Sequence, residues 1–272
     1  MKDYLKQLIQ EREGALIKSC IVREYLHARI LEIFQEIGIF RSWAFLGGTA
    51  LRFLYYLPRY SEDLDFSCID SAPMISFQKT LKKVKSVFEA ENYNIRIKIS
   101  DGKTVASAFI QFDALLFELG ISSHRTQVLS IKVEVDSNPP AGATVTTSLI
   151  RRYVTLNLLH YDKASLLAGK IHALLSRSYV KGRDLYDIVW YLADKTWPEP
   201  NISFLNSALL QTGWHKPIIT PDNWRAILYK KVKTINWKAA REDVKSFLEK
   251  VHDIDLITEE HFANLLLPSN HS

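Results

Sequence analysis

The sequence predicts an α+β protein, with a mixed sheet and flanking helices in the first part of the chain and a helical domain in the second. Between about residues 43 and 158, short segments of strand-like alternation are separated by segments of helical spacing. From about residue 161 onward, apolar residues recur at helical spacing almost throughout. No Gly- or Ser-rich linker separates the parts, so we expect two domains, 1–158 and 159–272, that pack together.

The composition is that of an ordinary globular protein. Of the 272 residues, 47% are apolar and 24% charged. Charged residues interrupt every apolar run before the roughly 18 residues that a membrane span needs, and the N-terminus lacks the pattern of a signal peptide. Cys20 and Cys68 are too few for a disulfide framework. We therefore expect a cytoplasmic protein.

The first part is predicted to begin with a long helix and to continue as strand, glycine turn, helix and strand. Apolar residues at helical spacing predict a helix over 14–37 that ends at Gly38. The next elements expected are a buried strand over 43–46, a helix over 49–57 stopped by Pro58, and a strand over 62–68. After these we expect a helix over 73–91, strands over 93–100, 104–112 and 128–136, a hairpin turn at Asp101-Gly102, and a strand pair within 144–158.

The second part is predicted to be helical and, near its end, basic. The expected helices cover about 161–179, 183–195, 201–211, 221–233, 237–252 and 257–266. Between residues 216 and 250 there are nine Lys or Arg against four Asp or Glu, interleaved with Trp224, Tyr229 and Trp237. Such a segment suits a nucleic-acid surface, but charge runs are also the solvated faces of ordinary amphipathic helices. Both interpretations stay open.

Two carboxylates on one predicted strand indicate a metal site. Because side chains alternate along a strand, Asp63 and Asp65 face one side while Leu64 and Phe66 face the other. Mg²⁺ takes oxygen ligands from one or two carboxylates and from substrate phosphates, and it keeps several waters. The pair therefore predicts a magnesium–phosphate site, although such pairs also occur on solvated edge strands.

A later strand offers a third carboxylate. In Ile131–Asp136, the side chains of Glu134 and Asp136 alternate with apolar ones and share a face. Glu134 is our first choice as the further metal ligand, and Asp136 is the alternative.

The residues just before the first pair suit a phosphate. Gly47 and Gly48 permit close approach of the backbone, and Thr49 opens a helix whose free N–H groups favour anions. The same residues would also make a plain strand-to-helix turn with Thr49 as the N-cap. No Walker A lysine pattern or Gly-x-Gly-x-x-Gly run occurs, which argues against ordinary P-loop and Rossmann sites.

Three side chains near this turn have open roles. Ser61 either bonds within the site or merely ends the loop, and Arg52 and Arg59 either meet phosphate or pair with Glu62.

A lysine interrupts an apolar helical stripe in the second part. Lys170 follows Lys163 and Leu167 on one helix face and would need an anionic partner if buried. Asp184 and Asp187, at i and i+3 on the next helix, can supply it. Lys170 would then either hold two helices together or reach a triphosphate as a point charge.

These motifs together resemble the AbiEii/AbiGii nucleotidyltransferase toxin family, which is related to the MenT toxins. The run Gly47-Gly48-Thr49-Ala50-Leu51 followed by Arg59–Phe66 is similar to its first motif. Lys170–Arg177 and Arg183-Asp184-x-x-Asp187 are similar to its lysine motif and its Arg-Asp-x-x-Asp motif. The resemblance extends over about residues 47–190.

The resemblance implies a minimal nucleotidyltransferase fold of the DNA-polymerase-β type, completed by a helical C-terminal domain. It implies Mg²⁺-dependent transfer from an NTP to an acceptor, with an RNA such as the 3′ end of tRNA as the expected acceptor and a cognate antitoxin as a partner. It also implies a role as a toxin or in phage defence. The catalytic residues expected are Asp63, Asp65, Lys170 and Asp184; the nucleotide-binding residues are Gly47, Gly48, Thr49, Ser61, Lys170, Arg183 and Asp187; the metal ligands are Asp63, Asp65, Glu134 and Asp136.

Two alternatives remain at this point. A nucleic-acid or partner-binding module could keep the fold without transferring nucleotides, and a metal-dependent phosphodiesterase could use the same carboxylates.

Overall fold

A computed structural model describes residues 2–69, 76–101 and 104–266, which fall into two compact units. The sheet unit comprises Met1–Tyr56, Tyr60–Asn138 and Thr146–His160. The helical unit comprises Leu57–Arg59, Pro139–Val145 and Tyr161–Ser272. Two segments that precede residue 158 in the chain, Leu57–Arg59 and Pro139–Val145, thus belong to the helical unit.

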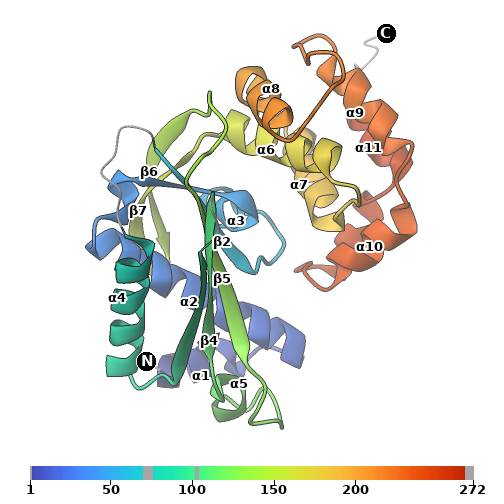
Figure 1. Cartoon of the computed structure of the whole chain (residues 1–272). Coiled ribbons are helices and arrows are strands. Elements are labelled where there is room, and N and C mark those ends of the chain that lie inside the picture. Colours follow the sequence, from blue (N-terminus) through green and yellow to red (C-terminus); the bar gives the residue numbers. More distant parts are fainter. Residues whose placement is uncertain (1, 70–75, 102–103, 267–272) are drawn as a thin grey trace. The chain divides into compact units, whose positions relative to one another are not determined.

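A mixed sheet forms the centre of the sheet unit (Figure 1). It has seven strands in the order β3-β4-β5-β2-β1-β7-β6. Its strands are β1 (Trp43–Leu46), β2 (Asp63–Cys68), β3 (Ile95–Asp101), β4 (Val105–Phe112), β5 (Leu129–Asp136), β6 (Val145–Arg152) and β7 (Val154–Tyr161). Strand β2 runs antiparallel to β1 and parallel to β5. The mixed sheet expected from the sequence is therefore confirmed.

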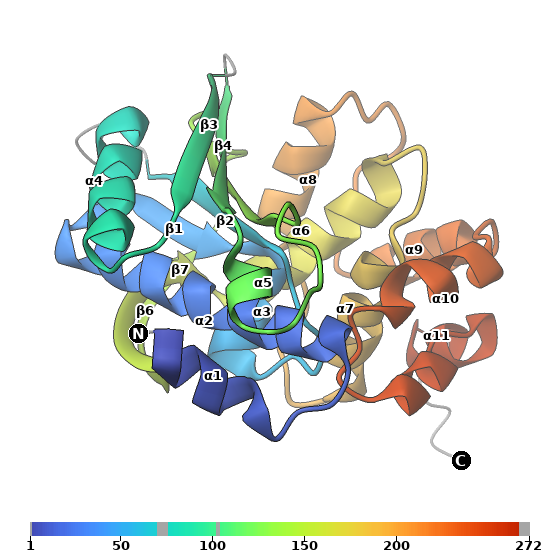
Figure 2. The same ribbon diagram turned by 90° about the horizontal axis from the view of Figure 1, so that it is seen from below.

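Two helices cover one face of this sheet, α2 (Ala15–Glu36) and α4 (Phe77–Ala90). Because side chains alternate along each strand, the apolar ones gather on one face of the sheet, and α2 and α4 cover that face. Phe34 of α2 lies 5.5 Å from the ring of Phe66 in β2, and Phe88 of α4 lies 5.1 Å from that of Phe112 in β4. The register between neighbouring strands puts Phe66 and Phe112 on the same face. Figure 2 shows the long helix α2 running beneath the strands, with α1 (Lys2–Gln10) against it.

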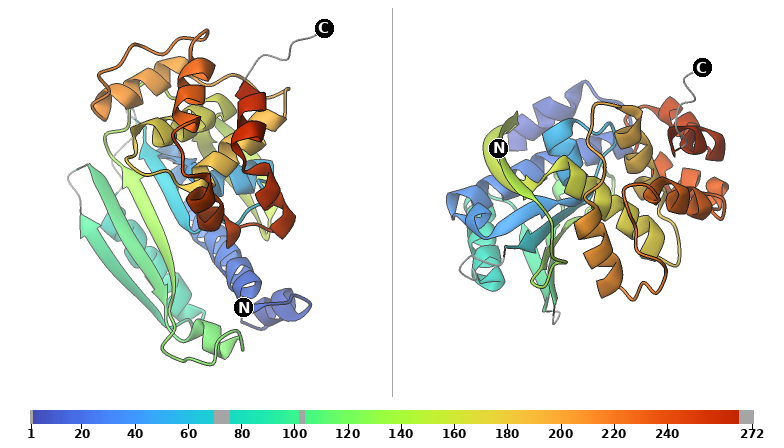
Figure 3. Two further views of the ribbon diagram at one scale, coloured as in Figure 1. Left: turned by 90° about the vertical axis from the view of Figure 1, so that its right-hand side faces the viewer. Right: turned by 90° about the horizontal axis from the view of Figure 1, so that it is seen from above.

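The helical unit is built from helices that follow one another along the chain. They are α6 (Lys163–Ser176), α7 (Gly182–Ala193), α8 (Ile202–Gln211), α9 (Trp224–Val232), α10 (Trp237–Lys245), the 3₁₀ turn η2 (Val251–Leu256) and α11 (Glu259–Leu266). Helix α6 packs on both α7 and α8, and α7 also packs on α10 and α11 (Figure 3). The helical C-terminal region expected from the sequence is confirmed.

Most predicted elements are present, with shifted ends. The helix expected over 49–57 is α3 (Gly47–Tyr55), and the single helix expected over 237–252 is divided into α10 and η2. The strands within 144–158 are longer than expected, eight residues each. The sequence did not predict α1, the 3₁₀ turn η1 (Ile39–Arg41) or α5 (Leu115–Glu118). Gly102 and residues 73–75, assigned to a hairpin turn and a helix start, lie outside the described residues.

None of the helices in the described part of the chain combines the length and the apolar character that a membrane span requires.

Helices α7 and α10 approach closely at a glycine. A Cβ added to Gly182 would stand 1.8 Å from the backbone oxygen of Ala240, and the Gly182 N–H donates to Asp243 Oδ2 at 2.8 Å. Backbone atoms cannot move aside as a flexible side chain does, so only glycine fits at this crossing.

We expect Gly182→Ala to lower the free energy of unfolding by about 1–3 kcal/mol, the usual cost of an overpacked contact. Urea titration followed by circular dichroism measures it.

Gly169→Ala is the matched control, because Gly169 lies inside α6 and a Cβ there would meet nothing within 4 Å. Alanine favours a helix interior over glycine by roughly 0.5–1 kcal/mol, so this variant should be slightly more stable than the wild type. Equal stability of the two variants would contradict the proposed close approach.

Candidate active site

The carboxylates that the sequence assigned to a metal lie on one face of strands β2 and β5. The parallel register places Asp65 directly opposite Glu134, and Asp63 opposite Lys132. Residues that pair across a sheet point to the same side. All four side chains are partly exposed, whereas Leu64 and Val133, which point to the opposite face, are fully buried. The alternation inferred from the sequence is thus present in both strands.

The register distinguishes the two candidates for a third carboxylate. Asp136 stands opposite Ser67, one pair further along, and its Oδ1 accepts a hydrogen bond from the backbone N–H of Asn138 at 2.9 Å. Glu134 is the cross-strand neighbour of Asp65, although one of its oxygens lies 2.8 Å from Lys132 Nζ. Glu134 is therefore better placed to act together with Asp65, while Asp136 ends the strand.

The donor set suits a hard divalent cation that retains water. Among the described residues, no three His, Cys, Asp or Glu side chains are grouped closely enough to hold a metal by themselves. Mg²⁺ does not require such a cage, because it is commonly bound by one or two carboxylates plus substrate phosphates. Asp63 and Asp65 fit that role, with Glu134 beside them.

Gly47 makes the position of Asp65 possible. It lies at the start of α3, with φ of +82°, and a Cβ there would come 2.3 Å from Asp65 Oδ2. A side chain would therefore both strain the backbone and displace the carboxylate. Leu46, the N-cap of α3, has no polar side chain that could cap the helix.

Thr49 and Ser61, which the resemblance assigned to nucleotide binding, lie where they contribute to the local fold around β2. The Thr49 side chain is fully buried and its hydroxyl donates to the backbone oxygen of Asp63, so it fixes the start of β2. Gly48 is buried in the first turn of α3, and Ser61 is partly buried in the segment that leads into β2. Next to it, the oxygen of Glu62 lies 3.0 Å from Nε2 of the buried His27.

In the helical unit, the lysine and aspartate motifs form one ion cluster, which is largely buried except at Arg177. Lys170 Nζ lies 3.0 Å from Asp184 Oδ1 and 2.7 Å from Asp187 Oδ2. Arg59 binds both oxygens of Asp187, each at 2.6 Å, and is only 2% exposed. Arg177 binds the second oxygen of Asp184. We name Arg59, Lys170, Arg177, Asp184 and Asp187 the ion cluster; it carries three positive and two negative charges.

The charges around Asp184 and Lys170 shift the pKa of each of these two groups in the direction that favours its charged form. Burial alone would raise the pKa of Asp184, but the positive charges of Lys170 and Arg177 outweigh it and keep that pKa below its ordinary value. Burial would likewise lower the pKa of Lys170, yet Asp187 and Asp184 raise it. The stabilisation from Asp184 is thus complete above about pH 4 and that from Lys170 below about pH 10, and each is lost beyond its shifted pKa.

Sequence reasoning anticipated part of this cluster. It paired Lys170 with the two aspartates but left the partner of Arg59 open. It gave no role to Arg177, although a spacing of seven residues from Lys170 puts both on one helix face. Arg183, expected to bind nucleotide, has its guanidinium 4.2 Å from the ring centroid of Phe247. Arg52, whose role the sequence also left open, pairs with the buried Glu24 within the sheet unit.

The fold and the motifs define a nucleotidyltransferase. Over residues 29–265 the chain matches the model of a family described as nucleotidyl transferase AbiEii toxin of type IV toxin–antitoxin systems. The chain belongs to this family, and it is a nucleotidyltransferase enzyme. The family resemblance inferred from the sequence is confirmed.

Solved structures share the fold at low sequence identity. MenT4, a nucleotidyltransferase toxin from Mycobacterium tuberculosis H37Rv, is 14% identical with a TM-score of 0.60, and the match covers 99% of this chain and 91% of that one. JHP933 from Helicobacter pylori is 17% identical with a TM-score of 0.57, covering 91% and 90%. No curated protein matches the chain in sequence.

We expect Gly47→Ala to reduce nucleotidyl transfer at least tenfold, because the new methyl group displaces the Asp65 carboxylate. Stability should fall by only about 1–2 kcal/mol, the cost of a non-glycine residue in the left-handed region. Transfer rates with labelled NTP, and thermal unfolding, measure the two effects.

Gly120→Ala is the matched control in the same unit. Gly120 also has a positive φ, +68°, but a Cβ there would meet nothing within 4 Å. It should lose similar stability and keep its transfer rate. Equal transfer rates in the two variants would argue against the placement of Asp65 beside Gly47.

We expect Asp187→Asn to lower the free energy of unfolding by about 3–5 kcal/mol, since it removes the carboxylate that the buried Arg59 guanidinium binds through two hydrogen bonds. The comparison variant is Asp255→Asn, which breaks an exposed ion pair with Arg241. The Asp255 side chain is 72% exposed, so the free energy of unfolding should fall by no more than about 1 kcal/mol. Denaturant titration of both variants compares them. Similar losses would show that the buried pair contributes no more than a surface pair.

Proposed function

We propose that this enzyme transfers a nucleotide from an NTP to an RNA acceptor in a Mg²⁺-dependent reaction, with the 3′ end of tRNA as the leading candidate. The acceptor hydroxyl attacks the α-phosphorus, the bond from that phosphorus to the bridging oxygen breaks, and pyrophosphate leaves. Such transfer would make the protein a toxin acting in the cytoplasm, restrained by a cognate antitoxin, with phage defence as the setting.

The observation that carries this proposal is the arrangement of Asp63 and Asp65 beside Glu134, with Gly47 fitted against Asp65. In the proposed roles Asp63 and Asp65 hold Mg²⁺, and Glu134 completes the site in preference to Asp136. The metal, when bound, would offset the negative charge of the phosphates and favour deprotonation of the acceptor hydroxyl. Gly48 and the first turn of α3 would approach the phosphates through backbone N–H groups.

The ion cluster supports the same chemistry from the helical unit. Its surplus of one positive charge is compatible with an anionic substrate, and Lys170 is a compact cation suited to phosphate. In this role Lys170 contacts the triphosphate while Asp184 and Asp187 orient the lysine. Arg183, whose guanidinium lies over the ring of Phe247, would contact the nucleotide as well.

The direct test incubates the purified full chain with each α-labelled NTP, MgCl₂ and total RNA. We expect label to enter RNA, and EDTA to abolish incorporation. Asp63→Asn and Asp65→Asn should each reduce the rate by roughly a hundredfold or more, because a metal contributes several kcal/mol to the barrier.

Glu13→Gln is the control variant, since Glu13 is an exposed carboxylate in the same unit. It should transfer at the wild-type rate. Product analysis distinguishes nucleotidyl transfer from hydrolysis. Transfer releases pyrophosphate and lengthens the acceptor, whereas hydrolysis releases a nucleoside monophosphate. Absence of labelled RNA with all four NTPs, or release of monophosphate alone, would refute the proposal.

A further inference from the structure

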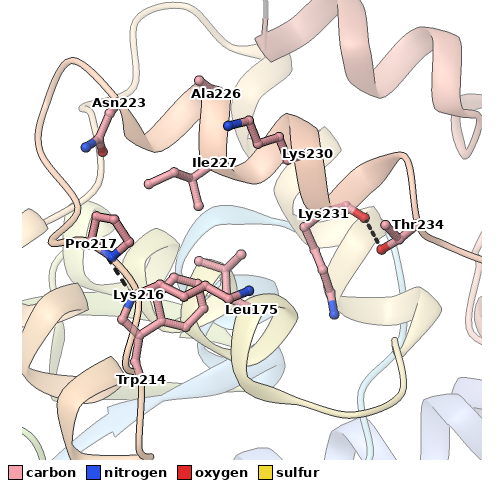
Figure 4. A pocket seen from close by; sticks show the side chains of 10 residues that line it. All are labelled: Leu175, Trp214, Lys216, Pro217, Asn223, Ala226, Ile227, Lys230, Lys231 and Thr234. Atoms are coloured by element: carbon pink, nitrogen blue, oxygen red, sulfur yellow. Dashed lines mark hydrogen bonds between the residues drawn. The ribbon is translucent and has the colours of Figure 1, made fainter.

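A pocket of about 590 Å³ lies in the helical unit (Figure 4), and none of the residues that line it belongs to the ion cluster. Its volume falls within the roughly 300–1,000 Å³ of small-ligand sites. The lining residues are Leu175, Trp214, Lys216, Pro217, Asn223, Ala226, Ile227, Lys230, Lys231 and Thr234. They come from the end of α6, the segment between α8 and α9, α9 itself and the turn that follows α9. None of them has a role in the function proposed above.

The lining combines an apolar part with separate positive charges. Leu175, Pro217 and Ile227 surround the indole of Trp214, which is partly buried. Lys216, Lys230 and Lys231 stand at different points around this apolar part (Figure 4), and none of the ten lining residues is acidic. Lys216 Nζ also lies 4.8 Å from the ring centroid of Trp214, so charge and aromatic surface adjoin.

This combination suits a strand of nucleotides. A base is flat and apolar on its faces and stacks on aromatic side chains, while the phosphates on either side of it need cations at separate positions. Lysines, as point charges without the planar fork of arginine, contact phosphate without demanding one geometry. The basic segment 216–250, whose role the sequence left open, contains all three lysines.

We propose that this pocket binds single-stranded RNA, taking one base against Trp214 and the adjoining phosphates on Lys216, Lys230 and Lys231. The proposal rests on the proposed function, because it names the surface that holds the acceptor RNA of the transfer reaction. A free NTP fits less well, since its phosphates are all at one end whereas the lysines are distributed around the pocket. An acidic protein segment would satisfy the charges but has no need of an aromatic wall.

The test measures the affinity of the full chain for a fluorescein-labelled, unstructured 12-nucleotide RNA at about 0.1 M salt. Lys230→Gln combined with Lys231→Gln should weaken binding by roughly 25-fold and make the slope of log K against log salt shallower by about 1.4, as expected for two lost phosphate contacts on a single strand. Trp214→Leu should weaken binding, while Trp214→Phe, which keeps an aromatic face, should restore most of it.

Lys238→Gln combined with Lys250→Gln is the matched control, because both lysines are exposed, lie in the same basic segment and do not line the pocket. It should bind RNA within about threefold of the wild type, and circular dichroism should show all variants folded. In transfer assays the Lys230/Lys231 variant should raise KM for RNA and leave kcat unchanged.

The outcomes separate this proposal from the proposed function. Asp65→Asn should bind the RNA as the wild type does, because Asp65 does not line the pocket. If the wild type binds RNA through the pocket but transfers no nucleotide, the transfer reaction alone is refuted. The pocket proposal is wrong if the wild type does not bind RNA, or if the Lys230/Lys231 variant binds it as tightly as the control. It is also wrong if that variant loses only affinity for ATP, or only the binding of a co-expressed antitoxin.

Discussion

The pairing register of β2 with β5 is the constraint on which the candidate site depends. It places Asp65 opposite Glu134 on one face while Phe66 and Val135 meet on the other. A slip of one residue would send the carboxylates into the core and the apolar side chains into water. Burying an unpaired carboxylate is far more costly than losing one apolar contact. The core under α2 and the site on the opposite face therefore specify the same register.

The ion cluster is a similar constraint in the helical unit. Asp187 is 1% exposed, so the protein must supply its positive partners. One of them, Arg59, is 128 residues away in sequence and follows a segment of the sheet unit. This pairing explains why Leu57–Arg59 belongs to the helical unit although the chain then returns to form β2. The same aspartate also contacts Lys170, so folding of the unit and placement of the lysine are coupled.

The local parts of this arrangement could be predicted from the sequence, and the long-range parts could not. Period-two alternation revealed that Asp63 and Asp65 share a face, and helical spacing matched Lys170 with Asp184 and Asp187. Glu134 was the first choice from the sequence, but its position opposite Asp65 depends on a register between strands more than sixty residues apart, which no local pattern encodes. The partner of Arg59 was open for the same reason. The short helix α5 was missed because four residues carry too little periodicity.

The candidate sites in the two units differ in the sign of the charge that they present. The face of β2 and β5 presents carboxylates, whereas the ion cluster and the pocket on α9 present surplus cations. A reaction between an NTP and RNA brings together two polyanions, whose repulsion must be offset before an acceptor hydroxyl can reach a phosphorus. Carboxylates alone would add to that repulsion, but a divalent cation bound to Asp63 and Asp65 would neutralise their two charges and attract phosphate oxygens. Cations at separate positions can then hold each polyanion independently, which is how a carboxylate-lined centre could serve two negatively charged substrates.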